Sequence, residues 1–382
     1  MADHRKTIAI YGATGYSGRS IAKELIAMGH DVLLTGRSPS ALRQLSAELG
    51  GVDHHVVELD DSHGLAALAS RVGTLVNAAG PFARTCAPVA AAAIAGGCHY
   101  VDISGEQQAI RALFDTYGSA AAAADVALVP SAAFYAALAD LLVSLAATGF
   151  ERVDDLDLAY HITDWVPSGA ALEARLRGLA LPVMAFDDGL VELRGQPPTR
   201  SMDFPAPIGR RRVVAYPLPE VLTIPRHVPV RRIRPAMTAS TVVPAFAERF
   251  APQLSRVFAW GLRSPLSGAF ERVAVAAGGG VRTRIANDPT HFHIVARLSG
   301  GGMHRTAALS GPGIFDSTGP IAARIAGRTV EDDFTASGPL AAAEVVDPAE
   351  FLDALRERGI RYRIDDAVVE RHDPATVNGE WR

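Results

Sequence analysis

The chain has 382 residues, of which 48% are hydrophobic and 20% are charged, and its formal net charge is −4. This length and composition predict about two or three domains with a sizeable core, and the charge argues against nucleic acid or an anionic membrane surface as a partner. The two cysteines, Cys86 and Cys98, form no CxxC motif, so neither a disulfide framework nor a zinc site is expected. A polar start and the lack of any apolar run of about 18 residues predict a cytoplasmic protein without signal peptide or membrane span.

The first third of the chain alternates short, apolar, β-prone runs with stretches of helical spacing. Strands are expected over 7–11, 31–35, 55–59, 74–78, 100–103 and 127–130. Helices are expected over 19–28, from a Ser38 cap to a Gly50-Gly51 stop, and over 62–71, 85–95 and 107–124. This alternation predicts an α/β fold with a doubly wound parallel sheet of Rossmann type. Such sheets bind ligands at the carboxyl ends of their strands, so the turns there are expected to carry the chemistry.

A glycine-rich turn lies between the first expected strand and the first expected helix. We expect it to bind a dinucleotide pyrophosphate, through Gly12, Ala13, Thr14, Gly15, Tyr16, Ser17 and Gly18. Gly12 permits the tight turn, Gly15 lets backbone N–H groups approach the pyrophosphate, and Gly18 lets helix and strand pack closely. The helix N-terminus attracts the negative charge. The alternative is a turn without a ligand, but strand, turn and helix occur in the order that a phosphate site requires.

The turn after the second strand is expected to select the cofactor. NAD-specific sites usually place Asp or Glu there, whereas this chain has Gly36-Arg37-Ser38. A guanidinium can bind a 2′-phosphate through two N–H groups and stack on adenine, and Ser38 adds a donor, so NADP(H) is the expected cofactor. The alternative for Arg37 is a solvated surface arginine. Asp60, after the third strand, is placed either to meet the adenine edge or to cap the next helix.

A turn of small residues follows the fourth strand. It comprises Asn77, Ala78, Ala79, Gly80 and Pro81. Small side chains would let the backbone run beside the nicotinamide ribose, so we expect these residues to contact the cofactor. A plain tight turn is the equal alternative.

Four motifs occur in order: Gly12-Ala-Thr-Gly-Tyr-Ser-Gly18, Thr35-Gly-Arg37, Val76-Asn-Ala-Ala-Gly-Pro81 and Tyr100-Val-Asp102-Ile-Ser-Gly105-Glu106. Over about residues 6–130 the chain resembles the saccharopine dehydrogenase-like reductases, which include saccharopine reductases and trans-acting enoyl reductases. The resemblance implies a Rossmann domain, a second α/β domain with a mostly antiparallel sheet, and a nicotinamide in the cleft between them. The enoyl-reductase branch has a polar Gly-Phe-Asp-Ser turn after its sixth strand. Here the chain reads Ala132-Ala133-Phe134-Tyr135, so a phenol stands where the relatives place a carboxylate.

The rest of the chain is expected to hold a second domain. Boundaries are expected at 1–132 for the dinucleotide-binding domain, 133–345 for a substrate and dimerisation domain, and 346–382 for a helix and tail that pack back on the first domain. We expect an edge-type strand over 153–162, a helix from Ser168, a strand over 190–193, a hairpin of 292–298 with 303–309, and a helix over 348–358. Residues 195–235 are rich in Pro and Arg; apart from a strand at 213–216 we interpret them as too proline-broken for a regular core, and as an interdomain or homodimer arm. Helical patterns over 240–277 carry aromatic residues that would wall a pocket or, more simply, pack a core or an oligomer: Phe246, Phe250, Phe258, Trp260 and Phe270.

Motifs for nucleophilic or metal-assisted catalysis are missing from the sequence. His291 and His293 share a strand face without a Cys or carboxylate cluster, so no metal is expected, and there is neither a Gly-x-Ser-x-Gly elbow nor a Tyr-x-x-x-Lys dyad. Hydride transfer requires the protein mainly to position the acceptor and to manage one proton at most. Tyr135 is the first candidate proton donor, with packing as its alternative, followed by Tyr160 or His161.

The expected function is NADPH-dependent reduction of an activated C=C or C=N bond in a small or acyl/polyketide-like substrate. Arg226 and His227 would suit an amino-acid imine, and the aromatic residues of 246–270 would suit an acyl acceptor. A cofactor-binding regulator without turnover is the alternative from another class, because a fold does not fix a function.

Overall fold

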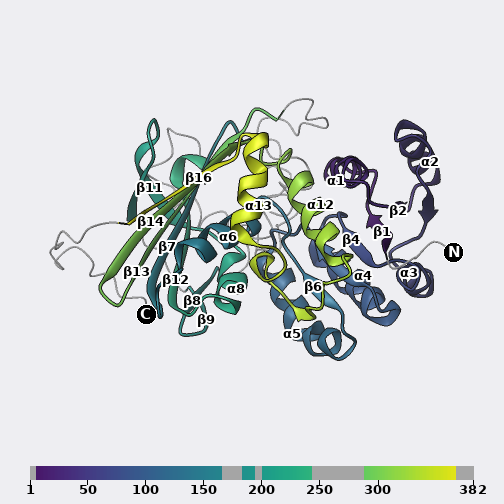
Figure 1. Ribbon diagram of the computed structural model, residues 1–382, viewed down its shortest axis with the longest axis horizontal. Helices are drawn as coiled ribbons and strands as arrows, with labels where there is room; N and C mark the ends of the chain where they lie inside the picture. Colours follow the sequence, from purple (N-terminus) through teal and green to yellow (C-terminus); the bar gives the residue numbers. More distant parts are fainter. Residues whose placement is uncertain (1–5, 166–182, 194–199, 243–287, 367–382) are drawn as a thin grey trace, which may run out of the picture. The chain divides into compact units, whose positions relative to one another are not determined.

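The computed structural model describes residues 6–165, 183–193, 200–242 and 288–366 (Figure 1). The chain divides into two compact units, one made of Met1–Leu141 and Ile314–Phe351 and the other of Leu142–Gly313 and Leu352–Arg382. Each unit is built around one β-sheet. In the described ranges, none of the helices combines the length and the apolar character that a bilayer crossing requires.

The first unit alternates strands and helices along the chain. Its elements are β1 (Ile8–Tyr11), α1 (Tyr16–Ala27), β2 (Val32–Gly36), α2 (Pro39–Glu48), β3 (His54–Val56), α3 (Ser62–Ala69), β4 (Thr74–Asn77), α4 (Phe82–Gly96), β5 (His99–Asp102), α5 (Gln107–Ala123), β6 (Ala127–Val129), α12 (Thr318–Thr329), β15 (Gly338–Pro339) and η4 (Ala342–Glu344). The seven-stranded sheet has the order β15-β6-β5-β4-β1-β2-β3, and all its pairings are parallel. Apart from β15 this is the 3-2-1-4-5-6 order of a doubly wound dinucleotide-binding fold, with its switch point between β1 and β4. The predicted Rossmann sheet is confirmed, with β15 as an unpredicted addition.

Two helices of this unit begin earlier than predicted. α1 starts at Tyr16 rather than Arg19, because Gly15 already takes the extended conformation of an N-cap residue. α4 starts at Phe82 rather than Thr85, with Pro81 as its N-cap. Both helices therefore reach directly to the turns at the carboxyl edge of the sheet.

The sheet is covered by helices on both faces. All four residues of β1 and all four of β4 are buried. On one face α3, α4 and α5 bring Leu65, Val89 and Leu113 into a core with Leu75 and Tyr100. On the other face α1 and α12 pack against each other and against the strands (Figure 1). With both faces buried, the carboxyl ends of the strands are left as the ligand-binding edge.

The second unit contains a nine-stranded, mostly antiparallel sheet. α6 (Ala137–Ala146) and α13 (Pro348–Ala354) each begin in the first unit and end in the second. The second unit's own elements are β7 (Val153–Thr163), β8 (Met184–Asp187), β9 (Leu190–Glu192), β10 (Arg200–Phe204), β11 (Gly209–Ala215), α8 (Glu220–Thr223), η2 (Ile224–Arg226), β12 (Val230–Thr238), α9 (Ala239–Val242), β13 (His291–Gly300), β14 (Met303–Pro312), η5 (Leu355–Arg358) and β16 (Arg361–Asp366). Its main path is β10-β11-β12-β7-β13-β14-β16, with β8 paired to β12 and β9 to β8. Among the described pairings β7 and β12 alone run parallel. This confirms the predicted class of the second sheet and the predicted hairpin.

Two predictions for this unit are wrong. β7 lies between β12 and β13, so it is a central strand and not an edge strand. The stretch 195–235, interpreted as too proline-broken for a regular core, supplies β10, β11 and most of β12. Its described prolines lie mainly in the turns between strands, as in the cis Ala206–Pro207 turn, where a missing N–H removes no ladder hydrogen bond.

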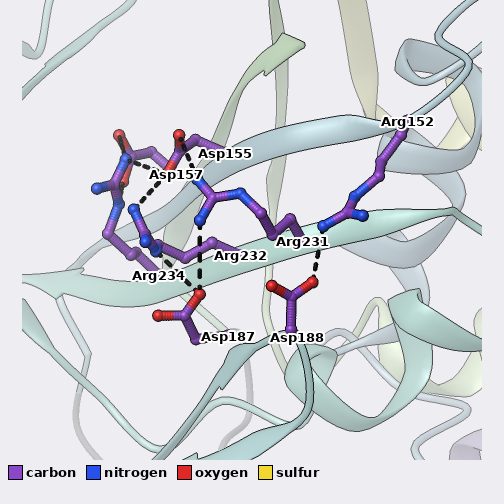
Figure 2. Close-up of polar contacts among 8 residues, drawn as sticks. All are labelled: Arg152, Asp155, Asp157, Asp187, Asp188, Arg231, Arg232 and Arg234. Carbon is purple, nitrogen blue, oxygen red and sulfur yellow. Dashed lines mark hydrogen bonds and ion pairs between the residues drawn. The ribbon is translucent and has the colours of Figure 1, made fainter.

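Arginine side chains of β12 pair with aspartate side chains of β7 and β8 in this sheet (Figure 2). Arg234 on β12 donates to Asp157 on β7 at 2.8 Å, and Arg232 reaches Asp155 at 3.2 Å. Arg232 also pairs with Asp187 of β8 at 3.3 Å. These groups are opposite in the register of β7 and β12, and each is only partly exposed, so the charges neutralise one another along the strands.

The compact units revise the predicted domain boundaries. Residues 314–345, expected in the second domain, return to the first unit, where Gly319 of α12 packs so tightly on α1 that a Cβ would lie 2.8 Å from the Cβ of Ser20. β15 then joins the first sheet beside β6. Conversely, β16 pairs with β14 in the second sheet, whereas the closing segment was predicted to pack on the first domain. Helical spacing reveals that a segment forms a helix but not which sheet it covers.

Several predictions concern residues outside the described ranges. They are the helix expected from Ser168 and nearly all of the aromatic stretch 240–277, of which the structure describes only the start. The predicted homodimer stays a prediction.

Candidate cofactor-binding site

The glycine turn joins β1 to α1 at the switch point of the first sheet. Gly12 has φ of 86°, a left-handed conformation that favours glycine, and its N–H donates to Thr35 O at 3.0 Å. A Cβ on Gly12 would lie 2.9 Å from the Cβ of Ala79, so the turns after β1 and β4 are in direct contact. Doubly wound folds bind a pyrophosphate at this point.

Gly15 and Gly18 differ in what surrounds them. Gly15 has φ −70° and ψ 167°, extended backbone that any residue can adopt. Among the described residues, a Cβ there would have one neighbour within 4 Å, Gly12 O at 3.3 Å. A Cβ on Gly18 would collide with Gly12 O and lie 2.9 Å from Ala13 Cα. Gly18 is therefore required for packing, whereas Gly15 leaves space in front of the helix N-terminus.

The first amides of α1 are available to an anion. Arg19 N–H is the first in the helix to bond the turn, donating to Gly15 O at 2.9 Å. The amides of Ser17 and Gly18 have no acceptor within the described part of the chain. The aligned peptide dipoles add a partial positive charge at this end. Together these features form a phosphate-binding arrangement.

Side-chain contacts hold the turn from two directions. Tyr16 OH donates to the carboxylate of Asp316, and the Tyr16 ring lies edge-on to Phe315 with 6.3 Å between centroids. Arg19 Nε donates to Thr14 O at 3.3 Å, and its guanidinium also forms an ion pair with α2. These protein contacts hold the conformation of the turn.

Arg37 follows β2, Asp60 follows β3, and both shift the pKa of the Tyr11 phenol at the end of β1. Burial, with repulsion by the Glu58 and Asp60 carboxylates, raises the pKa of Tyr11, and the positive charge of Arg37 opposes that shift. Arg37 is exposed and forms no ion pair with another described residue. The structure thus brings the predicted adenine-side residues together and leaves the guanidinium open to an anion.

Ser38 and Asp61 cap the helices that follow β2 and β3. Ser38 Oγ accepts from Ala41 N at 3.4 Å, which is the predicted cap of α2. Asp61 Oδ1 accepts from Gly64 N at 2.8 Å. The capping alternative for Asp60 is therefore wrong, because its neighbour takes that position. Asp60 is exposed, and its contact with adenine stays a prediction.

Asn77 shapes the turn after β4 from inside the protein. Its side chain is fully buried, Nδ2 donates to Tyr100 OH at 3.3 Å, and Oδ1 accepts from Ala79 N at 3.2 Å. The Gly80–Pro81 peptide is cis. The Asn77 side chain is thus committed to the turn, so contact with a cofactor would fall to the backbone of the small residues that follow.

A fully buried carboxylate at the end of β5 was not singled out as a site residue from the sequence. Asp102 accepts hydrogen bonds from Tyr100 OH at 2.9 Å and from the amides of Ser104 and Ser131 at 2.8 and 2.9 Å. Cys86 Sγ lies 3.4 Å from the same carboxylate. Burial raises the pKa of Asp102, and its hydrogen bonds oppose that shift. A carboxylate ending an otherwise apolar strand is the sequence signal that could have revealed it.

The last residue of the same motif, Glu106, caps α4. Its two carboxylate oxygens accept from the amides of Phe82 and Ala83 at 2.9 and 3.1 Å. The stretch from Tyr100 to Glu106 therefore holds the turn after β4 and the start of α4 together.

Tyr135 lies in the loop between β6 and α6, half-buried. Its ring packs against Phe134 at 4.7 Å between centroids, and a Cβ on Gly105 would lie 3.5 Å from its Cδ2. Ser131 and Ala136 have φ of 59° and 62°, values that are uncommon for residues with a side chain and that recur at functional sites. Tyr135 thus stands beside the loop that follows β5, at the carboxyl edge of the first sheet.

The other candidate donors belong to the core of the second unit. Tyr160 is fully buried and donates to the Glu220 carboxylate. His161 is 7% exposed, its Nδ1 lies 2.9 Å from Thr238 Oγ1, and burial lowers its pKa to about 4. Packing accounts for both side chains. Across the described residues, no group of three or more His, Cys, Asp or Glu side chains is arranged to hold a metal ion.

Comparison with known proteins identifies the first unit. Residues 8–129, which run from β1 to the end of β6, match the family described as the saccharopine dehydrogenase NADP binding domain. These residues are therefore similar to a saccharopine dehydrogenase NADP-binding domain. The predicted resemblance is confirmed for this NADP-binding domain, and the family supports NADP(H) as the cofactor.

Individual proteins are similar to this chain either in sequence or in fold. Trans-acting enoyl reductases of Mycobacterium bovis and Mycobacterium tuberculosis are 32% identical over 148 residues, which is 37% of this chain and 35% of the relative. The match therefore spans about a third of these curated relatives. Saccharopine dehydrogenase (L-Glu forming) of Saccharomyces cerevisiae aligns with a TM-score of 0.59 over 95% of this chain and 100% of that chain. At 12% identity this likeness concerns the fold alone.

Proposed function

We propose that the chain is an NADPH-dependent oxidoreductase that reduces an activated C=C or C=N bond in a small or acyl/polyketide-like substrate. The observation that carries the proposal is the NADP-binding domain, in which the glycine turn lies at the β1–β4 switch point and Arg37 stands exposed after β2. The 2′-phosphate that distinguishes NADPH from NADH suits a guanidinium that has no ion-pair partner among the described residues.

The choice between C=C and C=N follows the relatives. The enoyl reductases support a conjugated C=C acceptor, and saccharopine dehydrogenase supports the fold alone. The sequence identity to these relatives therefore favours an enoyl acceptor over an imine. The chain has Tyr135 and Ala136 in place of the polar Asp-Ser pair of that branch's turn, so we keep both bond types in the proposal.

Tyr135 is the proposed proton donor. Bound NADPH supplies the hydride, and the protein has to hold the acceptor and deliver one proton. Tyr135 lies at the carboxyl edge of the sheet, just before the N-terminus of α6, where the helix dipole favours developing negative charge. Its phenol would hydrogen-bond the acceptor and then protonate it.

The test is NADPH oxidation in the presence of two acceptor classes, a short enoyl thioester and a cyclic amino-acid imine. The proposal expects turnover with one of them, and Tyr135→Phe should lower kcat by about 10²-fold with NADPH affinity unchanged. A loss below about threefold would assign Tyr135 to packing and leave positioning as the main contribution.

A non-catalytic NADP(H)-binding regulator is the second candidate. The observation in its favour is the departure at Tyr135 and Ala136, a half-buried phenol and a buried methyl group where the enoyl-reductase branch carries the polar Asp-Ser pair of its turn. Tight NADPH binding without oxidation by either acceptor class would favour the regulator. The free, buried thiols of Cys86 and Cys98 support the proposed cytoplasmic location for either candidate.

A further inference from the structure

Three loops at the carboxyl edge of the first sheet converge on one carboxylate. Asp102 Oδ1 accepts from the amide of Ser104 at 2.8 Å, just after β5, and from the amide of Ser131 at 2.9 Å, just after β6. Asp102 Oδ2 accepts from Tyr100 OH at 2.9 Å, and that hydroxyl in turn accepts from Asn77 at the end of β4. One side chain thus connects the ends of β4, β5 and β6.

Further bonds fix the same three loops. Ala132 N donates to Asp102 O at 2.7 Å, and Ser131 Oγ donates to Ser104 O at 2.5 Å. Ser131 takes its left-handed conformation at this junction, so the start of the loop that carries Tyr135 is set by its bonds to the β5 loop. These hydrogen bonds therefore hold the loop after β5 and the loop after β6 against each other.

Only a carboxylate satisfies this arrangement. Burying it without partners would be strongly unfavourable, and four donors directed at its two oxygens offset that desolvation. An asparagine could keep the two backbone bonds through its carbonyl oxygen, but its amide nitrogen accepts nothing from Tyr100 or Cys86. The hydrogen bonds from Tyr100 and Cys86 therefore require the second carboxylate oxygen of Asp102.

These loops belong to one half of the nucleotide site. In the 3-2-1-4-5-6 order each half of the sheet binds one mononucleotide, and the adenine-side residues Arg37 and Asp60 lie on the β1–β3 half. The β4–β6 half is left for the nicotinamide mononucleotide. We propose that Asp102 is a positioning residue that holds the loops after β4, β5 and β6 as the platform for the nicotinamide half of NADPH. The inference rests on the proposed NADPH-dependent function.

The test separates the two halves of the cofactor. Wild type and Asp102→Asn are titrated with NADPH and with adenosine 2′,5′-bisphosphate, which carries only the adenine side. We expect Asp102→Asn to weaken NADPH binding by at least about tenfold and to change bisphosphate binding by less than about twofold. The fluorescence enhancement of bound NADPH, a property of the nicotinamide ring, should also decrease.

Two further variants guard against a general loss of folding. Thr74→Val removes a buried hydrogen bond to Thr329, 2.7 Å long, at the opposite end of β4, and should lower stability without separating the two ligands. Tyr100→Phe removes the hydroxyl that joins Asp102 to Asn77 but leaves the two backbone bonds to Asp102, and should give the same separation with a smaller amplitude. If Asp102→Asn does not fold, the two titrations of Tyr100→Phe test the positioning role in its place.

Equal weakening of both ligands, or no change in either, by Asp102→Asn (or by Tyr100→Phe in its place) overturns the positioning role. If wild-type protein binds neither ligand, the proposed function itself fails, and that outcome is distinct from the first.

Discussion

Replacing Gly15 by valine should abolish cofactor binding without unfolding the protein. Gly15 has extended backbone angles that suit any residue, and a Cβ there meets only Gly12 O, at 3.3 Å, among the described residues. A small shift of the turn accommodates that contact. The valine methyl groups then occupy the space in front of the α1 N-terminus, where the Ser17 and Gly18 amides have no acceptor in the described ranges.

The expected loss follows from those two amides. A hydrogen bond to a charged group contributes about 1.5–3 kcal/mol, so losing two to the pyrophosphate would cost about 3–6 kcal/mol. This corresponds to a rise in the Kd for NADPH of about 10²–10⁴-fold. The free energy of unfolding should change by less than about 1 kcal/mol, since a glycine replaced at compatible angles also restricts the unfolded chain.

Gly18→Ala is the matched control. Its Cβ would overlap Gly12 O and press on Ala13, so this smaller substitution should destabilise the protein by about 1–3 kcal/mol or more. NADPH affinity is measured by fluorescence titration and stability by thermal unfolding. Wild-type affinity in a folded Gly15→Val protein would refute the assignment of this turn to the pyrophosphate. Unfolding of Gly15→Val with Gly18→Ala intact would refute the packing argument.

Three other predictions address neighbouring features. Asp60→Ala should weaken NADPH binding at unchanged stability, whereas Asp61→Ala removes the α3 cap and should lower stability by about 1 kcal/mol at unchanged affinity; the reverse pattern would exchange their roles. Asp157→Ala removes the carboxylate that lies 2.8 Å from Arg234 and should destabilise the second unit by about 1–3 kcal/mol, measured by calorimetry. Asp203 is more exposed, so Asp203→Ala should cost less than about 1 kcal/mol. The pKa of His161 is lowered to about 4 in the folded protein, so the unfolded chain binds more protons between about pH 6.5 and 4, and the free energy of unfolding should fall by about 2–3 kcal/mol as the pH drops through that window. His161→Asn should remove this part of the acid sensitivity. Identical pH profiles of stability for wild type and variant would contradict the assignment.

Local signals explain why the first unit was predictable. Apart from β3, whose three residues are exposed, each strand before residue 130 is a short and largely buried run, and features such as the Ser38 cap and the glycine turn have recognisable residues in fixed order. The switch point and the residues around it follow from those elements, because parallel strands place their carboxyl ends at one edge.

Non-local pairing explains what the sequence did not reveal. Asp102 is held by Ser131, 29 residues further along the chain, and no local pattern announces such a partner. The return of α12 and β15 to the first sheet is likewise decided by packing on α1 and β6. The strands of 200–238 were missed because prolines were counted by composition, whereas their position in the turns is what matters.

We propose that this domain binds NADPH through Arg37, and a titration of wild type and Arg37→Ala with NADPH and NADH tests this role most directly. Wild type should bind NADPH at least about tenfold more tightly than NADH, and Arg37→Ala should lose about 1.5–3 kcal/mol of NADPH binding with NADH affinity nearly unchanged. Comparable affinity of wild type for both cofactors, or a preference for NADH, would contradict the account.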